Sequence, residues 1–159
     1  MANRPAGRRN GRRICSIQPQ GSGDHAGTTG ATANQYIGTQ DLTGGSVLGR
    51  SGTIANLFGS LSNGSDAAFT SRGAHTGFIG LVRNASASIT MRSSSTETTN
   101  AIASQTPRNE SMFVFARPGS PAQTYTNASL AFYSIGESLD LAALDTRVTA
   151  LINAINVAF

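Results

Sequence analysis

The chain has 159 residues, of which 18 are Gly, 19 are Ser and 17 are Thr, and only 13% are charged. This length suits one domain, and small hydroxylic residues with frequent Gly favour short strands joined by tight turns over a helical bundle. The formal net charge is +4, all 12 cationic residues are Arg, and Cys15 is the one cysteine. A single cysteine excludes an internal disulfide. No membrane span is expected, because no apolar run approaches 18 residues. No secretory signal is expected, because no apolar region follows the charged N-terminus.

Residues 1–34 are predicted to form an extended N-terminal arm. Five of the twelve Arg lie within the first 13 residues, which contain no acid, whereas the rest of the chain has seven Arg and eight Asp or Glu. The segment that follows is rich in Gly, Ser and Thr, and the arm as a whole has too few apolar residues to fold alone. The positive charge therefore belongs to the arm, and the remainder of the chain is nearly neutral.

The candidate partner-binding residues are the four arginines of this arm, Arg8, Arg9, Arg12 and Arg13. Clustered guanidinium groups bind either nucleic acid or an acidic neighbouring subunit, and a solvated tail is the third alternative. A subunit contact is favoured over nucleic acid, because the nearly neutral body offers no supporting basic face and the nearest aromatic residue is Tyr36. Deleting residues 1–20 is then expected to leave a folded domain that no longer assembles.

Residues 35–159 are predicted to form an all-β domain, an antiparallel β-sandwich or jelly roll with one C-terminal helix. Turn signals separate the candidate strands at 44–45, 62–64, 83–84 and 118–119. A strand spacing of roughly 8–12 residues is typical of a sandwich. The candidate strands are 35–39, 46–49, 54–61, 67–71, 77–83, 86–92, 101–105, 111–117 and 129–135.

The strand predicted over 111–117 is apolar on both faces. Phe113 and Phe115 alternate with Met112, Val114 and Ala116, so each face of the strand carries large or small apolar side chains. A central strand of this kind is expected to be covered on both sides, with the C-terminal helix on one of them.

A helix is predicted over about residues 140–156. Asp140 stands where an N-cap acceptor belongs, just ahead of an apolar stripe with the spacing 3, 4, 3, 4. The stripe residues, expected to pack the helix on its own sheet, are Leu141, Leu144, Val148, Leu151 and Ile155. Self-association through this stripe and Phe159 is the alternative, although a stripe of barely two heptads is short for a coiled coil.

Four segments carry a resemblance to a known family: 77–83 (GFIGLVR), 103–107 (ASQTP), 112–117 (MFVFAR) and 130–155. They resemble the C-terminal module of many tailed-bacteriophage structural proteins, which is a concanavalin A-like (laminin-G-like) jelly roll. The resemblance covers about residues 35–159 and is strongest over 112–155. It implies a structural role in a virion, near receptor binding or particle decoration.

Three classes of function compete. The favoured one is a non-enzymatic structural protein of a tailed-bacteriophage virion, either a head decoration or cement subunit or a tail appendage. Such a protein would be made in the host cytoplasm, be released by lysis, form a homo-oligomer and bind other virion proteins. A lectin-like module of a tail fibre that binds host-surface glycan is the alternative, and a polysaccharide-degrading enzyme is the third class. Neither nucleic acid nor membrane is an expected partner.

The sequence gives no candidate catalytic, cofactor-binding or metal-binding residues. His25 and His75 lie far apart in the chain, and with Cys15 they do not have the spacing of a zinc site. No G-x-S-x-G nucleophile motif is present, and glycoside hydrolysis needs two carboxylates about 5–9.5 Å apart. Glu137, Asp140 and Asp145 are instead assigned to the helix, its cap and its surface.

Overall fold

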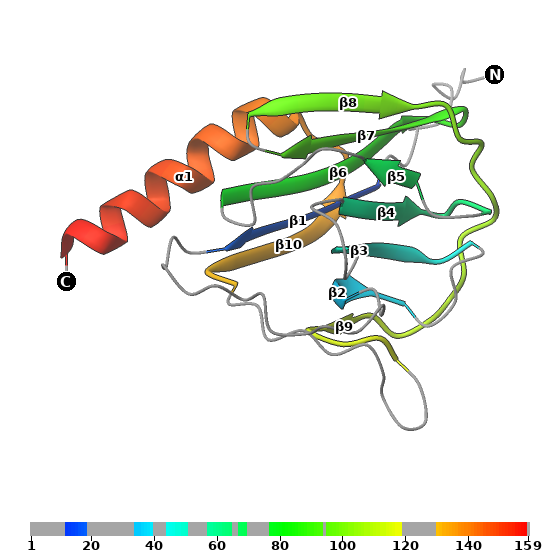
Figure 1. Cartoon of the computed structure of the whole chain (residues 1–159), viewed down its shortest axis with the longest axis horizontal. Helices are drawn as coiled ribbons and strands as arrows, with labels where there is room; N and C mark the ends of the chain where they lie inside the picture. The colour runs from blue at the N-terminus through cyan, green and yellow to red at the C-terminus, as the bar shows by residue number, and fades with distance from the viewer. Residues whose placement is uncertain are drawn as a thin grey trace, which may run out of the picture.

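The computed structural model describes residues 12–18, 34–39, 44–50, 57–64, 67–69, 77–93, 95–118 and 130–158. Within them the chain is mostly β, with ten strands followed by one C-terminal helix (Figure 1). The strands are β1 Arg12–Gln18, β2 Asn34–Gly38, β3 Ser46–Arg50, β4 Leu57–Leu61, β5 Ala67–Phe69, β6 Gly77–Ala85, β7 Ser88–Ser93, β8 Thr96–Asn100, β9 Phe113–Val114 and β10 Phe132–Glu137. The helix is α1 Leu141–Ala158.

The strands form two antiparallel sheets of five strands each. Sheet A has the order β10-β1-β6-β7-β8, and sheet B has the order β5-β4-β3-β2-β9. Strands β2 to β5 and β6 to β8 are successive antiparallel neighbours, whereas β9 and β10 return to lie beside β2 and β1. The first and last strands of the described chain therefore lie side by side in sheet A, which the blue and orange arrows of Figure 1 show.

The two sheets share one apolar core. Sheet B contributes Tyr36, Ile37, Leu48, Leu57 and Leu61 to it, and sheet A contributes Ile79, Leu81, Ile89 and Met91. The sheets approach closely where β4 crosses β6, because a Cβ atom at Gly59 would lie 2.6 Å from Leu81 Cδ2. Only glycine leaves room there for the leucine, so this position fixes how near the two sheets can come.

Strand β6 is covered on both faces. Ile79 and Leu81 point into the core between the sheets. Phe78 and Val82 alternate with them and so lie on the opposite face of sheet A, where they pack with α1. The molecule therefore has three layers in the order α1, sheet A and sheet B.

Most of the predicted strands agree with the structure, including those at β7 and β10, but one turn and two strands do not. Strands β2, β3, β4, β5 and β6 lie where strands were expected. The turn expected at Arg83-Asn84 is wrong, because β6 continues to Ala85 and the turn lies at Ser86-Ala87. The strand expected over 101–105 is also wrong: its contribution to sheet pairing is an isolated bridge between Ser104 and Asn63, and the strand of this region is β8.

The strand expected over 111–117 is reduced to the two residues of β9, at an edge of sheet B. Met112 and Val114 pack against the core, as the alternation predicts. Phe113 and Phe115, in contrast, are 39% and 40% exposed. The expectation that both faces of this strand are covered is therefore wrong, and β6 has that position instead.

The boundary of the predicted N-terminal arm also needs correction. Residues 12–18 of the expected arm 1–34 form β1, which pairs with β10 on one side and β6 on the other. The polar composition of the arm as a whole hid this short segment, which contains Ile14, Cys15 and Ile17. Residues 1–11 and 19–33 lie outside the described residues.

Candidate functional site

The structure places two of the four candidate arginines at the start of β1. Arg12 lies opposite Glu137 of β10 and Arg83 of β6 in the antiparallel register, and Arg13 follows it in the same strand. Arg8 and Arg9 lie outside the described residues. The backbone of the Arg-rich segment is therefore anchored in an interior strand of sheet A at its C-terminal end.

The N-terminal half of α1 is seated on the outer face of sheet A. Leu141 and Val148 are buried, with 3% and 5% exposed, and Leu144 packs beside them. Gly80 of β6 lies beneath this contact, because a Cβ atom there would be 2.9 Å from Leu141 Cδ2 and 2.7 Å from Phe78 Cε1. The absent side chain lets the first turn of the helix lie directly on the strand.

The C-terminal half of the predicted stripe does not reach the sheet. Leu151 and Ile155 are 50% and 46% exposed, whereas Ile152, which the stripe omitted, packs against the helix seat. An α-helix has 3.6 residues per turn, so a 3-4 stripe drifts around the helix relative to a fixed surface. In addition, α1 extends past the ends of β1, β6 and β10, so nothing in sheet A lies beneath its last turns (Figure 1).

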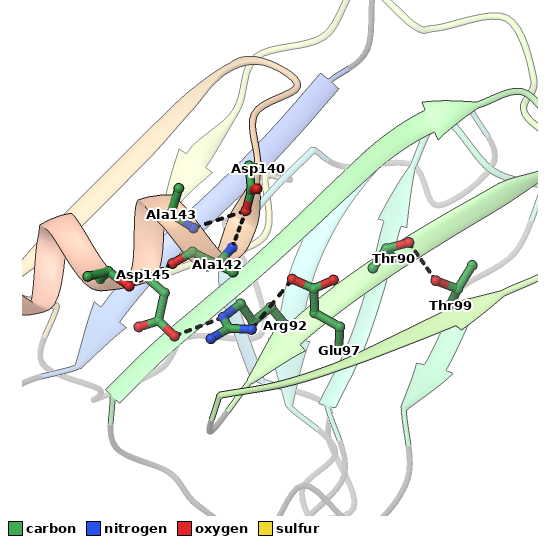
Figure 2. A network of polar contacts seen from close by, with 9 residues as sticks. Thr90, Arg92, Glu97, Thr99, Asp140, Ala142, Ala143 and Asp145 are labelled. Carbon is green, nitrogen blue, oxygen red and sulfur yellow. Dashed lines mark hydrogen bonds and ion pairs between the residues drawn. The ribbon is translucent and has the colours of Figure 1, made fainter.

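The predicted N-cap is confirmed. Asp140 Oδ1 accepts hydrogen bonds from the backbone N–H groups of Ala142 at 2.8 Å and Ala143 at 3.0 Å (Figure 2). These two donors belong to the first turn, where an α-helix has no internal acceptors for its N–H groups. The cap therefore fixes where the helix starts, just above its seat on Gly80.

A polar clip joins the middle of α1 to sheet A. Arg92 Nε of β7 donates to Asp145 Oδ2 at 2.8 Å, and both side chains are almost buried, at 14% and 13% exposed. Arg92 also faces Glu97 of β8, with 3.5 Å between Nη1 and Oε1 (Figure 2). Thr149 Oγ1 donates to Asp145 Oδ1 at 3.3 Å. Such pairing is what allows two charges to be withdrawn from water beside an apolar seat.

The role expected for Asp145 is therefore corrected from a surface residue of the helix to a buried ion-pair partner. A sequence signal for this was present. Asp145 follows Leu141 by four residues and precedes Val148 by three, which places it on the same helix face as these buried side chains. An acid on the apolar face of a helix needs a cation from the element beneath it.

Arg83 of β6 forms the other polar centre, although the sequence pattern had indicated a turn residue. It is 8% exposed, and its guanidinium donates to backbone carbonyl oxygens and to the Asn63 side chain. Its carbonyl acceptors are Leu61 at 2.8 Å from Nε and, from Nη1, Ile102 at 2.9 Å, Ser88 at 3.1 Å, Ser86 at 3.2 Å and Ala85 at 3.3 Å.

This set of acceptors, the Arg83 carbonyl cradle, ties three separate parts of the chain together. They are the end of β4, the turn between β6 and β7, and the segment after β8. Burial lowers the pKa of the Arg83 guanidinium below its ordinary value. The cradle offsets that desolvation with charge-assisted hydrogen bonds, so its chemistry is that of a structural tie.

Metal-binding side chains do not gather in the part of the chain that the structure describes. No group of three or more His, Cys, Asp or Glu residues is placed there to hold a metal ion. His25 and His75 lie outside the described residues. The described helix α1 does not have the length and apolar character needed to cross a membrane.

Comparison of the chain with protein-family models, with curated proteins and with solved structures finds no match.

Proposed function

We propose that this chain is a non-enzymatic structural protein of a tailed-bacteriophage virion. It is a surface subunit, either a head decoration or cement protein or a tail appendage, and it assembles through its Arg-rich N-terminal segment and its two-sheet body. In this proposal the body is a concanavalin A-like jelly roll, and its partners are other virion proteins and further copies of itself. The resemblance of residues 35–159 to phage structural modules supports the proposal, together with one structural observation.

That observation is the attachment of the Arg-rich segment to an interior strand. Arg12 and Arg13 open β1, which is hydrogen-bonded between β10 and β6, and Arg4, Arg8 and Arg9 precede this strand within eight residues of it. A pulling force on these arginines, when they are bound to a partner, would be transmitted through the backbone of β1 to sheet A. An attachment of this kind suits an element that holds a subunit on a larger assembly.

The chemistry of the segment favours an acidic protein surface as its partner. Guanidinium groups form bidentate hydrogen bonds with carboxylates, and each charge-assisted bond contributes about 1.5–3 kcal/mol. Ordering each backbone residue costs about 1–2 kcal/mol, so a few such bonds offset the ordering of a short arm. In the proposal, the arginines provide this offset when the subunit docks.

The position of β1 changes how the proposal must be tested. Deletion of residues 1–20 removes an interior strand of sheet A, so the expectation that this truncation leaves a folded domain is withdrawn. The informative variant lacks residues 2–11 and keeps β1. It should remain folded by circular dichroism. It should be absent from virus particles that are purified on a density gradient and probed with an antibody against this protein.

Two controls make this test specific. Arg8→Lys with Arg9→Lys keeps the charge and should retain partial incorporation, because lysine cannot form the bidentate contact. Arg108→Ala with Arg147→Ala removes the same charge elsewhere and should incorporate normally. Absence of the intact protein from every particle fraction would overturn the structural role. Normal incorporation of the truncated protein would overturn only the role of the arginines and would leave the structural role in place.

A glycan-binding module of a tail fibre is the second candidate, and the exposed aromatic pair at the edge of sheet B favours it. Phe113 and Phe115 are 39% and 40% exposed, and Phe115 has a φ of 68°. A phenylalanine with positive φ is strained, and such strain concentrates at functional sites. The backbone N–H of Phe115 donates to Tyr36 O at 2.8 Å, which holds this conformation.

Binding to an array of bacterial surface glycans distinguishes the second candidate from the first. A glycan-binding module should retain a defined set of glycans, and Phe113→Ala or Phe115→Ala should each weaken that binding at least tenfold. Phe58→Ala, a half-buried phenylalanine on β4, is the matched control. This candidate is contradicted if the protein binds no glycan. It is also contradicted if the double variant Phe113→Ala with Phe115→Ala binds as well as the unchanged protein.

A further inference from the structure

Arg83 is a buried cation whose hydrogen-bond acceptors in the described part of the chain are all neutral. They are the backbone carbonyl groups of the Arg83 carbonyl cradle and the side-chain oxygen of Asn63. Burial lowers the pKa of the guanidinium, as expected where no carboxylate lies beside it. Buried charges in proteins are usually paired with an opposite charge, so a carboxylate is the group that this site would accommodate best.

Asn63 is the side chain among these acceptors, and its amide group is only half satisfied. Its Oδ1 accepts hydrogen bonds from Arg83 Nη2 and from the backbone N–H of Leu61, the second at 3.3 Å. Its Nδ2 is buried and has no hydrogen-bond partner among the described residues. Exchange of this nitrogen for an oxygen would remove an unpaired buried donor and would place a negative charge beside Arg83.

The residue that follows Asn63 supplies a chemical route to that exchange. Gly64 has no side chain to hinder its backbone nitrogen, and it is exposed, so solvent reaches this residue beside the buried asparagine. In an Asn-Gly sequence the following backbone nitrogen attacks the side-chain amide carbon most readily, because any larger residue crowds the attack. The other Asn-Gly sequence of the chain is Asn10-Gly11.

We propose that Asn63 is a modification site at which deamidation supplies a counter-ion for Arg83. The Gly64 nitrogen bonds to Cγ of Asn63, the bond from Cγ to Nδ2 breaks, and the amide proton of Gly64 leaves with Nδ2 as ammonia. Water then adds to Cγ of this succinimide, the bond from Cγ to the Gly64 nitrogen breaks, and that nitrogen regains a proton. The product is aspartate at position 63, with the backbone intact. The inference concerns the cradle alone and does not depend on a virion role.

The two donors on Oδ1 assist both steps. In each addition to Cγ, negative charge develops on this oxygen, which already accepts from one charged and one neutral donor. Preorganised donors aimed at a developing charge lower the barrier, as in an oxyanion hole. Attack of water at the backbone carbonyl of the succinimide would give isoaspartate instead, and that oxygen accepts from the neutral Gly44 N–H at 2.6 Å. The structure therefore favours aspartate over isoaspartate.

Peptide mapping of the full chain by mass spectrometry, at intervals during incubation at mildly alkaline pH, tests the inference. Both Asn-Gly peptides are assayed for aspartate and isoaspartate, the second with an isoaspartyl methyltransferase. In the folded protein, aspartate should exceed isoaspartate at position 63. In urea, both positions should give mainly isoaspartate, as unrestrained peptides do. Asn63 that stays intact in the folded protein after Asn10 has fully converted overturns the inference, as does an isoaspartate majority at position 63.

Asn63→Asp gives the proposed product directly and shows whether the fold accommodates it. In urea denaturation this variant should lower the unfolding equilibrium constant about tenfold, because a charge-assisted pair with Arg83 replaces a neutral acceptor. Asn109→Asp is the matched control, because it adds the same charge at an exposed position and should have little effect. An Asn63→Asp variant that is no more stable than the unchanged protein overturns the inference, because the carboxylate would then not act as a counter-ion.

Discussion

Substitution of Arg83 by methionine should be among the most destabilising single changes in the described part of the chain. Methionine keeps most of the length of the side chain but removes every donor of the Arg83 carbonyl cradle. The buried carbonyl oxygen of Leu61, 2.8 Å from Arg83 Nε, and the side-chain oxygen of Asn63 each lose a charged partner. Asn63 itself is 0% exposed, so water does not replace that donor without local opening.

The magnitude follows from the hydrogen bonds that are lost. A hydrogen bond to a charged group contributes about 1.5–3 kcal/mol, and a buried acceptor left unpaired costs about 1–3 kcal/mol. Leu61 O is left unpaired, and Asn63 Oδ1 loses its charged partner but keeps the Leu61 N–H at 3.3 Å, which together give a loss of about 3–5 kcal/mol for Arg83→Met. A domain of this kind has a total stability of about 5–15 kcal/mol, so the variant should be close to unfolding at ordinary growth temperatures.

Urea denaturation followed by far-ultraviolet circular dichroism measures this loss. Arg108→Met is the matched control, because Arg108 is 47% exposed in its contact with Glu110 at 3.4 Å, and exposed pairs contribute about 0–1 kcal/mol. Arg83→Lys should give an intermediate loss, since one ammonium group cannot reach all the acceptors. If Arg83→Met costs no more than Arg108→Met, the cradle does not hold the three segments together and the reasoning is refuted.

This loss should also be independent of pH over the usual range. Burial lowers the pKa of Arg83, yet an arginine in a protein stays protonated. A lowered pKa on a basic group affects stability only when the pH approaches that pKa. The difference between Arg83→Met and the unchanged protein should therefore be the same at pH 6 and pH 9, and a difference that changes between them would contradict a permanently charged guanidinium.

Three further changes test how α1 is held on sheet A, each by urea denaturation. A double-mutant cycle of Arg92→Met and Asp145→Asn should give a coupling energy of about 1–3 kcal/mol, and a value near zero would mean that the two side chains do not act as a pair. Asp140→Ala should cost about 0.5–2 kcal/mol by removing the N-cap, whereas Asp140→Ser should cost less. Gly80→Ala should cost about 1–3 kcal/mol, because its methyl group meets the first turn of the helix, and an unchanged stability would show that the seat can adjust.

Strand and helix positions could be predicted from the sequence where local patterns were strong. Short apolar runs predict β3, β4 and β6. The N-cap residue and the apolar stripe behind it predict α1. Strand β8, with the sequence TETTN, has no apolar alternation because it lies at the edge of sheet A with exposed side chains. Its β-branched threonines are the main strand signal in the sequence, and the apolar Ala101-Ile102-Ala103 beside it gives a stronger but misleading one.

The pairing of distant residues could not be predicted from local patterns. The partner of Asp145 is Arg92, 53 residues earlier in the chain, and Arg83 is satisfied by carbonyl groups whose positions depend on the arrangement of both sheets. The charge and composition of residues 1–34 predict an extended partner-binding arm, although a strand begins within it at Arg12. Charge describes what a segment can bind, but the neighbours of a strand follow from the whole topology.

The pairing of β1 with β10 has a consequence for how the protein is made. Ile17 lies opposite Phe132 and Arg12 opposite Glu137, so β1 meets this neighbour only after the chain through residue 137 has left the ribosome. Until then β1 has β6 alone as a partner in sheet A, and one of its edges stays open. Contacts between residues so far apart in sequence slow folding, and unpaired edges favour aggregation while the chain waits. Slower growth at low temperature should therefore increase the yield of soluble protein. The concentration of incomplete chains with an unpaired β1 edge is then lower, so they aggregate less.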